Sequence, residues 1–463
     1  MTTTLWPNNM EDAYPLSRLQ AGMLFHSAYS PETDIAVYHD IFSFHLRAVF
    51  DLAALQRAVN QIVLRHAVLR TSFDLTNFSQ PLQLVHNVVH VPVHVEDLRA
   101  LTPVEQEAAL NVWMQNEKRQ PFDWTQPPLL RFQVHRRSEE TFEFTVSFHH
   151  AILDGWSVAS MLTELFQIYL SQLGQAVPPL KLAPQVTFRD FVALERKVIA
   201  TEEPRRYWSE KLQDSTALLL PRWELGRPKD NSRQVLQHEV LLPVEVSTNL
   251  RRLAQSAGVP LKSVLLAAHL WVLSRLGNQD DVLTGLVSHG RPEEADGERV
   301  LGLFLNTLPF RLKLSGGTWH DLVRETYRVE QDMLPFRLYP LAEIQKLRGG
   351  QPLFETAFNF IHFHVYQSLG EFAAVQQLGG RLYEETNFTL LANFSQDVHS
   401  PQVHLTLMYD NTILSVAQVA ALGGYYARTL TAMAEHPHQP YTAAALLSTA
   451  ERQQLVTTWN ATH

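Results

Sequence analysis

The chain has 463 residues, which predicts two domains of about 200 residues each rather than a single core. Its 45% hydrophobic and 18% charged residues are typical of a globular protein, and no apolar run reaches the roughly 18–20 residues of a membrane span. The net charge of −9, without a basic stripe, argues against nucleic acid as the main partner. The absence of cysteine excludes disulfides, thiolate nucleophiles and cysteine-ligated metals, and with no signal peptide evident we expect a cytoplasmic protein.

The first half of the chain alternates helical and strand patterns. Apolar residues at spacings of three and four predict an amphipathic helix over Leu52–Leu64. Two strands, Leu129–His135 and Thr141–His149, follow and are joined by a polar turn. Alternation in the second strand places its phenylalanines on one face and its threonines on the other. The period then becomes helical over Trp156–Leu173.

Glycine and proline interrupt the pattern near residue 180, where we expect the domain boundary. The second half mixes the same patterns. Its predicted helices are Val246–Ala257, Leu261–Leu276, Val416–Ala434 and Ala443–Leu455, and its predicted strands are Val282–Val287, Thr307–Leu314 and Val403–Tyr409. We therefore predict an α/β fold (an α+β sandwich) with domains 1–180 and 181–440, and a linker over 441–463.

A candidate site lies where the second strand gives way to the helix, in the segment His149–Gly155 (HHAILDG). His150 ends the strand, where a side chain can project into a cleft. A neutral imidazole with a pKa of about 6.5 can accept a proton from an attacking amine or hydroxyl. Asp154 can hold the loop by pairing with an arginine, and Gly155 permits a tight turn or a close approach of backbone to substrate.

A purely structural interpretation of the same segment is open. Asp154 or Ser157 can cap the helix that begins near Trp156, because both side chains satisfy free N–H groups there. We predict no metal site, because adjacent histidines point to opposite faces of a strand and no nearby residue has a metal-binding spacing.

Further segments, in order along the chain, resemble the motifs of condensation domains of nonribosomal peptide synthetases. The five that carry the resemblance are Tyr14–His26, Arg65–Phe73, Phe148–Ser157 with the HHxxxDGWS core, Phe188–Phe191 and Leu301–Thr307. Leu446–Arg452 is similar to the linker that leads into an adenylation domain, and Trp459–Thr462 is similar to the first residues of that domain. The resemblance covers essentially the whole chain.

This resemblance implies two chloramphenicol acetyltransferase-like subdomains that form a V-shaped pseudodimer with a tunnel between them. It implies an acyltransferase of secondary metabolism, in which the amine of an acceptor aminoacyl-carrier protein attacks a donor acyl thioester to form an amide. The acyl groups would be carried on the phosphopantetheine of a carrier protein or on coenzyme A, with no cofactor bound by the domain itself. A downstream adenylation domain is the further partner implied, and neither nucleic acid nor membrane is.

The resemblance also implies roles for individual residues. His150, with His149 beside it, is expected to act on the amine as a base or as an orienting group, while Asp154 and Gly155 shape the loop. Arg291 matches the arginine that pairs with Asp154. Structural support is expected from Arg65 and Ser157, and tunnel lining from Trp156, Val158 and Asn306.

Related functions are separated by single positions. Epimerisation domains share the HHxxxDG core but carry a glutamate where this chain has Val287, so the second base is missing. Heterocyclisation domains have aspartates in place of the histidines. The non-enzymatic alternative is a platform that only recruits carrier proteins, and the intact His150 and Asp154 argue against it.

The donor is the open part of this hypothesis. If Met1 is the natural start, the opening motif at Tyr14 leaves no room for an upstream carrier protein, so we expect the donor to arrive in trans. We then expect a starter domain of lipopeptide biosynthesis, which uses a fatty acyl-CoA or an acyl carrier protein. Small, uncharged residues at 158–160 would leave space for such a chain. The alternative is an elongation domain with a peptidyl- or aminoacyl-carrier donor in trans.

Overall fold

The computed structural model describes residues 9–29, 38–223, 233–294, 296–361, 372–396 and 400–453. The chain divides into two compact units. Unit 1 comprises Met1–Ala200, Gly290–Leu305 and Phe363–Glu385, and unit 2 comprises Thr201–His289, Asn306–His362 and Thr386–His463. Both units mix helices and strands, as the sequence predicts.

The first division falls after Ala200, not near residue 180 as predicted, because helix α5 (Phe188–Ile199) packs on unit 1. The ring centroids of Phe188 and Phe191 lie 5.2 and 5.0 Å from that of Phe304, and the backbone N–H of Arg18 donates to Glu195 at 2.9 Å. The later segments Gly290–Leu305 and Phe363–Glu385 also belong to unit 1. The local sequence pattern did not predict that they return to the first unit.

Unit 1 contains five helices and eight strands among its described residues. The helices are α1 (Arg18–Tyr29), α2 (Leu52–Arg65), α3 (Pro103–Glu117), α4 (Gly155–Gln172) and α5. The strands are β1 (Met10–Pro15), β2 (His39–Arg47), β3 (Thr71–Asp74), β4 (Leu82–His86), β5 (Val93–Asp97), β6 (Leu130–Arg136), β7 (Thr141–His149) and β12 (Gln376–Tyr383).

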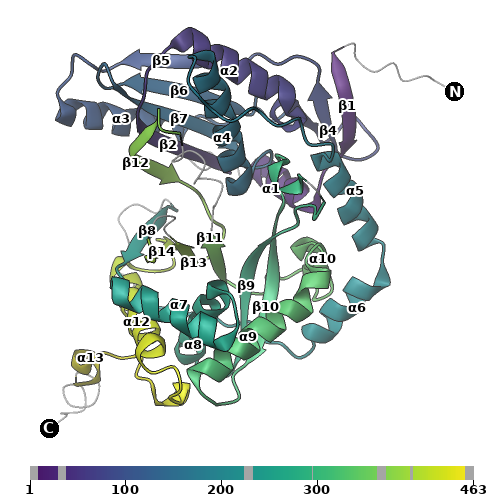
Figure 1. Ribbon diagram of the computed structural model, residues 1–463. Coiled ribbons are helices and arrows are strands. Elements are labelled where there is room, and N and C mark those ends of the chain that lie inside the picture. The colour runs from purple at the N-terminus through teal and green to yellow at the C-terminus, as the bar shows by residue number, and fades with distance from the viewer. Residues whose placement is uncertain are drawn as a thin grey trace. The chain divides into compact units, whose positions relative to one another are not determined.

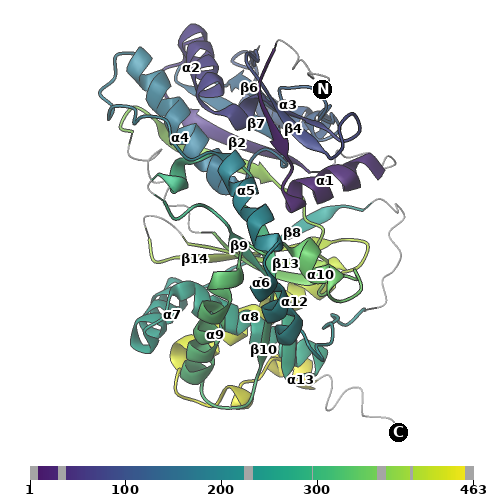
Figure 2. The same ribbon diagram turned by 90° about the vertical axis from the view of Figure 1, so that its right-hand side faces the viewer.

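A five-stranded sheet in the order β12-β2-β7-β6-β5 forms the centre of unit 1 in the described residues, with β1-β4-β3 as a separate three-stranded sheet. In the larger sheet only β5 and β6 are parallel. Helices α2 and α4 pack together on one face of it (Figure 1; Figure 2). There the phenylalanines of β7 enter an apolar core with Val59, Ile62 and Leu165.

The polar face of β7 is buried as well, although its alternation would suit a solvent-facing surface. Glu143 and Thr145 lie 2.9 and 2.7 Å from the hydroxyl of Ser43 on β2, and the hydroxyl of Ser147 donates to Glu117 of α3 at 2.5 Å. These hydrogen bonds offset the cost of burying polar groups.

Unit 2 is built around a six-stranded sheet in the order β10-β9-β11-β13-β14-β8, as far as the described residues show. The strands are β8 (Val235–Val240), β9 (Asp281–His289), β10 (Leu305–Lys313), β11 (Thr356–Ile361), β13 (Leu390–Gln396) and β14 (Val403–Asp410). The helices are α6 (Glu202–Lys211), α7 (Val244–Ala257), α8 (Leu261–Gly277), α9 (Trp319–Met333), α10 (Leu341–Lys346), α12 (Val416–Glu435) and α13 (Thr449–Gln453). Helices α7, α8, α9 and α12 lie together beside this sheet (Figure 1).

The C-terminal segment differs from the sequence prediction. In place of one helix over Ala443–Leu455, a short 3-10 turn (Tyr441–Ala443) is followed by α13. The backbone of Ala444 is extended (φ −72°, ψ 137°), so no helix runs through this residue. The predicted resemblance at Trp459–Thr462 lies outside the described residues.

Among the described residues, no single helix has the length and apolar character to cross a bilayer. One bent pair, Val244–Ala257 with Leu261–Gly277 at 106°, meets the criteria of length and composition when taken together.

Candidate active site

The β7–α4 junction presents His150 at the end of the large sheet of unit 1. Strand β7 ends at His149, and the backbone N–H of His150 donates to the carbonyl of Tyr38 at 2.8 Å, which extends the pairing with β2 by one residue. The chain then turns, and α4 begins at Gly155 with Asp154 as its N-cap. The side chain of His150 remains 21% exposed. A substrate can therefore reach part of this ring.

The surroundings of His150 keep its imidazole neutral. Burial lowers the pKa of His150 below its ordinary value. The carboxylates of Glu384 and Asp154 act on this pKa in the opposite direction, as does a hydrogen bond with the backbone of Leu153. A neutral imidazole at pH 7 can accept a proton from an amine or hold the amine by a hydrogen bond.

His149 has a different environment. Its side chain is buried, and Nδ1 accepts a hydrogen bond from the backbone N–H of Ala151 at 3.1 Å. Burial lowers the pKa of His149 to about 3, with further lowering by His150 and His39. A neutral, buried ring that accepts from the turn beside it stabilises the loop. His149 is therefore enclosed in unit 1, with 3% of its surface exposed, in contrast to the partly exposed His150.

Asp154 is fully occupied by donors. Its Oδ1 accepts from the backbone N–H of Ser157 at 2.7 Å and from Nη2 of Arg291 at 2.7 Å. Its Oδ2 accepts from the backbone N–H of Phe304 at 3.0 Å. Both interpretations of the sequence therefore hold together, since the carboxylate caps α4 and pairs with the arginine. A carboxylate bound by three donors fixes the loop and has little capacity left for proton transfer.

Arg291 completes this buried pair. The side chains of Arg291 and Asp154 are only 3% and 1% exposed. Nη1 of Arg291 donates to the carbonyl of Val300 at 2.6 Å, and the guanidinium lies 4.5 Å from the ring centroid of Phe304 and 5.4 Å from that of Trp156. Arg291 thus joins the segment Gly290–Leu305 to the loop that carries His150.

Ser157 and Gly302 form a second connection between the same two segments. The hydroxyl of Ser157 donates to the carbonyl of Gly302 at 2.8 Å and accepts from its backbone N–H at 3.0 Å. The same hydroxyl accepts from Nη2 of Arg291 at 2.7 Å, and the backbone N–H of Asp154 donates to the carbonyl of Gly302 at 3.0 Å. The hydroxyl of Ser157 therefore connects α4 to the segment Gly290–Leu305 through three hydrogen bonds.

Gly302→Ala is expected to destabilise this connection. A Cβ at position 302 would lie 2.3 Å from Cδ2 of Phe188, so α5 or the loop must move. We expect the free energy of unfolding to fall by about 1–3 kcal/mol, as for other overpacked sites. Denaturant titration checks this against Gly22→Ala, where no atom lies within 4 Å of the added Cβ. Equal stability of the two variants would contradict the tight packing at Gly302.

The other predicted residues lie in less central positions. Arg65 pairs with Glu164 of α4 at 3.0 Å, which links α2 to α4 and supports the structure. Trp156 is half-buried, and its Nε1 donates to the carbonyl of Glu298 at 2.9 Å. Gly155 is the first residue of α4, so its backbone is helical and needs no glycine-specific conformation.

One predicted tunnel-lining residue differs from expectation, and the lining role of a second stays a prediction. Val158 has no exposed surface and belongs to the core of unit 1, because it lies on the inward face of α4. It therefore lines no open space here. Asn306 lies in unit 2, where its Nδ2 donates to the carbonyls of Arg337 and Tyr339, each at 2.9 Å. Its side chain holds the turn before α10.

Two acidic residues near His150 were not predicted from the sequence. Oδ2 of Asp40, at the start of β2, lies 3.1 Å from Nδ1 of His150. Glu384, which follows β12, interacts electrostatically with both His150 and Asp40. Neither residue belongs to a motif, and strand pairing alone brings them to the site.

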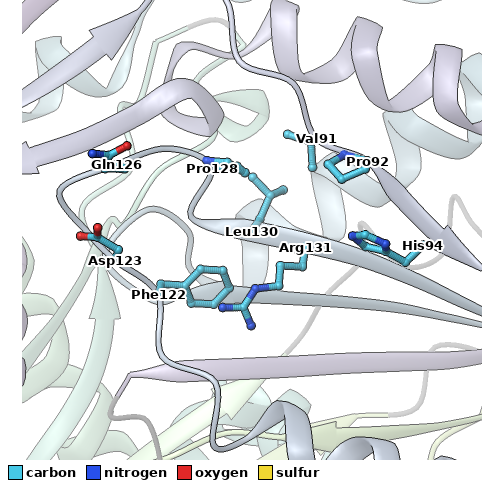
Figure 3. Close-up of a pocket in the computed structure, with 9 residues that line it drawn as sticks. All are labelled: Val91, Pro92, His94, Phe122, Asp123, Gln126, Pro128, Leu130 and Arg131. Carbon is cyan, nitrogen blue, oxygen red and sulfur yellow. The ribbon is translucent and has the colours of Figure 1, made fainter.

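A separate cavity of about 300 Å³ lies elsewhere in unit 1, beside β5 and β6 (Figure 3). Its lining is Val91, Pro92, His94, Phe122, Asp123, Gln126, Pro128, Leu130 and Arg131, and includes none of the predicted site residues. Arg131 is already paired with Glu117 at 2.7 Å and lies over the ring of Phe122 at 4.0 Å. Because this cavity contains none of the predicted site residues, the β7–α4 junction remains the candidate site.

The family model for the condensation domain matches residues 10–456, nearly the whole chain. The chain belongs to the condensation-domain family of nonribosomal peptide synthetases. Members of this family are amide-forming acyltransferases, so the enzyme class predicted from the motifs is confirmed at that general level.

Two synthetases illustrate the relationship. The condensation domain is 35% identical over 454 residues to the AMB antimetabolite synthetase AmbE of Pseudomonas aeruginosa, which covers 97% of this chain and 21% of that protein. It is 30% identical over 469 residues to one of the linear gramicidin synthase proteins of Brevibacillus parabrevis, covering 98% of this chain and 6% of that protein. The chain thus spans about a fifth or less of the length of these relatives.

Solved structures confirm the fold. The condensation domain from the Monacolin K polyketide synthase MokA superposes with a TM-score of 0.78 at 17% identity, covering 94% of this chain and all of that one. The mixed α/β, acetyltransferase-like fold predicted from the sequence is therefore confirmed for this condensation domain.

Proposed function

We propose that this condensation domain forms an amide bond at His150. The amine of an aminoacyl group on an acceptor carrier protein attacks the carbonyl carbon of a donor acyl thioester. A C–N bond forms, the C–S bond breaks, and the donor's thiol is released, while the acceptor keeps the elongated acyl group on its phosphopantetheine. The proton lost from the amine passes to the departing thiolate, by way of His150 if that ring acts as the base, or directly if it only orients the amine.

The observation that carries the proposal is that His150 is partly exposed while the loop that holds it is fixed. Part of the ring is open to solvent and neutral, while the loop that holds it is fixed through Asp154 and Arg291. A fixed, accessible imidazole is what proton transfer or alignment of an amine requires. No cofactor enters these steps, and the acyl groups arrive on phosphopantetheine or coenzyme A.

The donor class is the finer part of the proposal. A starter donor, fatty acyl-CoA or acyl carrier protein, is the hypothesis to test first, and a peptidyl- or aminoacyl-carrier donor in trans is its alternative. The space for an apolar chain expected near residue 158 does not support the starter type, because Val158 and Ala159 are fully buried. The choice therefore depends on direct measurement.

One assay separates the two donors. The chain is incubated with an aminoacyl-carrier acceptor and, in parallel, with fatty acyl-CoA, an acyl carrier protein or a peptidyl-carrier protein. The mass of the acceptor carrier is then followed by intact-protein mass spectrometry. A starter domain is expected to add the fatty acyl group to the acceptor. Turnover with the peptidyl carrier alone would rule out the starter type.

A further inference from the structure

The start of β2 brings a carboxylate next to the imidazole of His150. On the β2–β7 ladder Asp40 lies opposite Phe148, and Phe148 and His150 share a face because residues two apart in a strand do so. Asp40 and His150 are thus diagonal neighbours across the two strands, within reach of each other's side chains. Oδ2 of Asp40 lies 3.1 Å from Nδ1 of His150, and the Asp40 side chain is 6% exposed.

Among the described residues, the Nδ1 atom of His150 lacks a hydrogen-bond partner, and the Asp40 carboxylate can supply one. This nitrogen is buried and makes no hydrogen bond to any residue in the part of the chain that the structure describes. A buried nitrogen without a partner is unfavourable, because it has lost its hydrogen bonds to water and gained none in return. The distance of 3.1 Å between Nδ1 and Oδ2 of Asp40 suits a hydrogen bond, but the N–H bond does not point at the oxygen. A rotation of the imidazole ring would align the two.

We propose that Asp40 is the positioning residue of His150. Its carboxylate holds Nδ1, which fixes the tautomer and orientation of the ring and leaves Nε2 as the nitrogen that meets the acceptor amine. The role of Asp40 rests on the proposed role of His150. It adds to that proposal a partner from β2 that lies outside the HHxxxDG segment.

The carboxyl groups around His150 form one electrostatic unit. Burial raises the pKa of Asp40, the Glu385 carboxylate raises it further, and a hydrogen bond from the backbone of Glu385 opposes them. Burial also raises the pKa of Glu384, as does Asp40, while His150 lowers it. The neighbouring His39 lies opposite His149, on the other face of β2, and its Nε2 is 3.6 Å from Oε1 of Glu117.

Removal of the Asp40 carboxyl is therefore expected to shift the pKa values of its neighbours in a known direction. Glu384 loses a like charge, so its pKa falls. His150 loses a nearby carboxylate, so its pKa falls as well. If Glu384 or His150 controls the rising limb of activity with pH, that limb moves to lower pH. Burial raises the pKa of Asp40 to about 8, so if Asp40 itself controls the limb, the limb disappears in the variant. A residue that only supported the fold would leave the limb where it is.

The test is Asp40→Asn in the 463-residue chain, which removes the charge at nearly constant volume. With an aminoacyl-carrier acceptor and a donor that the wild type accepts, we expect kcat to fall about 10- to 100-fold, as for other lost outer-shell partners of a functional histidine. We expect KM for both carriers to be unchanged, and the rising limb of kcat against pH to move to lower pH or to disappear. Asp40→Ser replaces this variant if the asparagine form does not fold.

Ser43→Ala is the matched control, because Ser43 is a buried polar residue on the same strand that bonds Glu143 and Thr145. Its melting temperature calibrates the cost of a buried polar change in β2. The role of Asp40 would be overturned if kcat fell no further than in the control, if the pH limb stayed in place, or if the loss only followed the unfolded fraction. An inactive wild type would instead contradict the proposed function.

Discussion

His150→Ala is expected to lower the rate of amide formation by about 10²- to 10⁴-fold, the contribution of a well-placed general acid–base group. The fold should be retained, because the ring is at the edge of the core and partly exposed. The rate is measured under single-turnover conditions with loaded donor and acceptor carriers, and folding is checked by thermal melting.

His404→Ala provides the control for this variant. His404 is exposed on β14 of unit 2, so the same chemical change should leave the rate unaltered. If His150→Ala formed product as fast as this control, the catalytic interpretation would fail. The protein would then act as a platform that recruits carrier proteins.

The second large effect concerns the ion pair of Asp154 and Arg291. Asp154→Leu or Arg291→Met leaves a buried charge without its partner, and each is expected to reduce the free energy of unfolding by about 3–5 kcal/mol. The Asp154 variant also loses the N-cap of α4. Denaturant titration followed by tryptophan fluorescence measures both changes.

The double variant distinguishes charge from shape at this pair. With both charges replaced by apolar side chains, we expect much of the stability to return, because no unpaired charge remains. We also expect catalysis in the single variants to fall in step with the unfolded fraction. A large loss of rate with unchanged stability would show instead that Asp154 acts in the chemistry.

Local pattern was sufficient for the elements around the site. The predicted strand Thr141–His149 has the bounds of β7, because strict alternation gives a clear period of two. The helix after it was placed within two residues of α4, since its apolar stripe and its N-cap Asp154 mark the start. The pairing of Asp154 with Arg291 came from the family resemblance, and the structure places the two side chains 2.7 Å apart.

Contacts between distant segments could not be predicted in this way. The buried face of helix α3 mixes Leu110 and Met114 with the polar Gln106 and Glu117, so its apolar pattern is weak. Glu117 accepts a hydrogen bond from Ser147 on the polar face of β7. Strand β12 joins β2 from more than 300 residues away, so no local period announces it. Asp40 and Glu384 reach His150 only through these pairings, which is why the sequence pointed to the histidine without its acidic neighbours.

Val158 illustrates a limit of a different kind. Its position next to the HHxxxDG segment suggested a lining residue, but helical geometry turns it inward. Adjacency in sequence to a reactive residue does not place a side chain in the site. Burial in the folded chain decides this.

The central claim is that the chain joins an acyl group to an amine at His150. It is tested most directly by tandem mass spectrometry of the acceptor carrier after incubation with the wild type, with His150→Ala or without the chain. We predict that the wild type adds the acyl group to the nitrogen of the tethered amino acid, and that the other two samples show almost none. Equal acylation in all three samples, or none with any donor class, would contradict the claim.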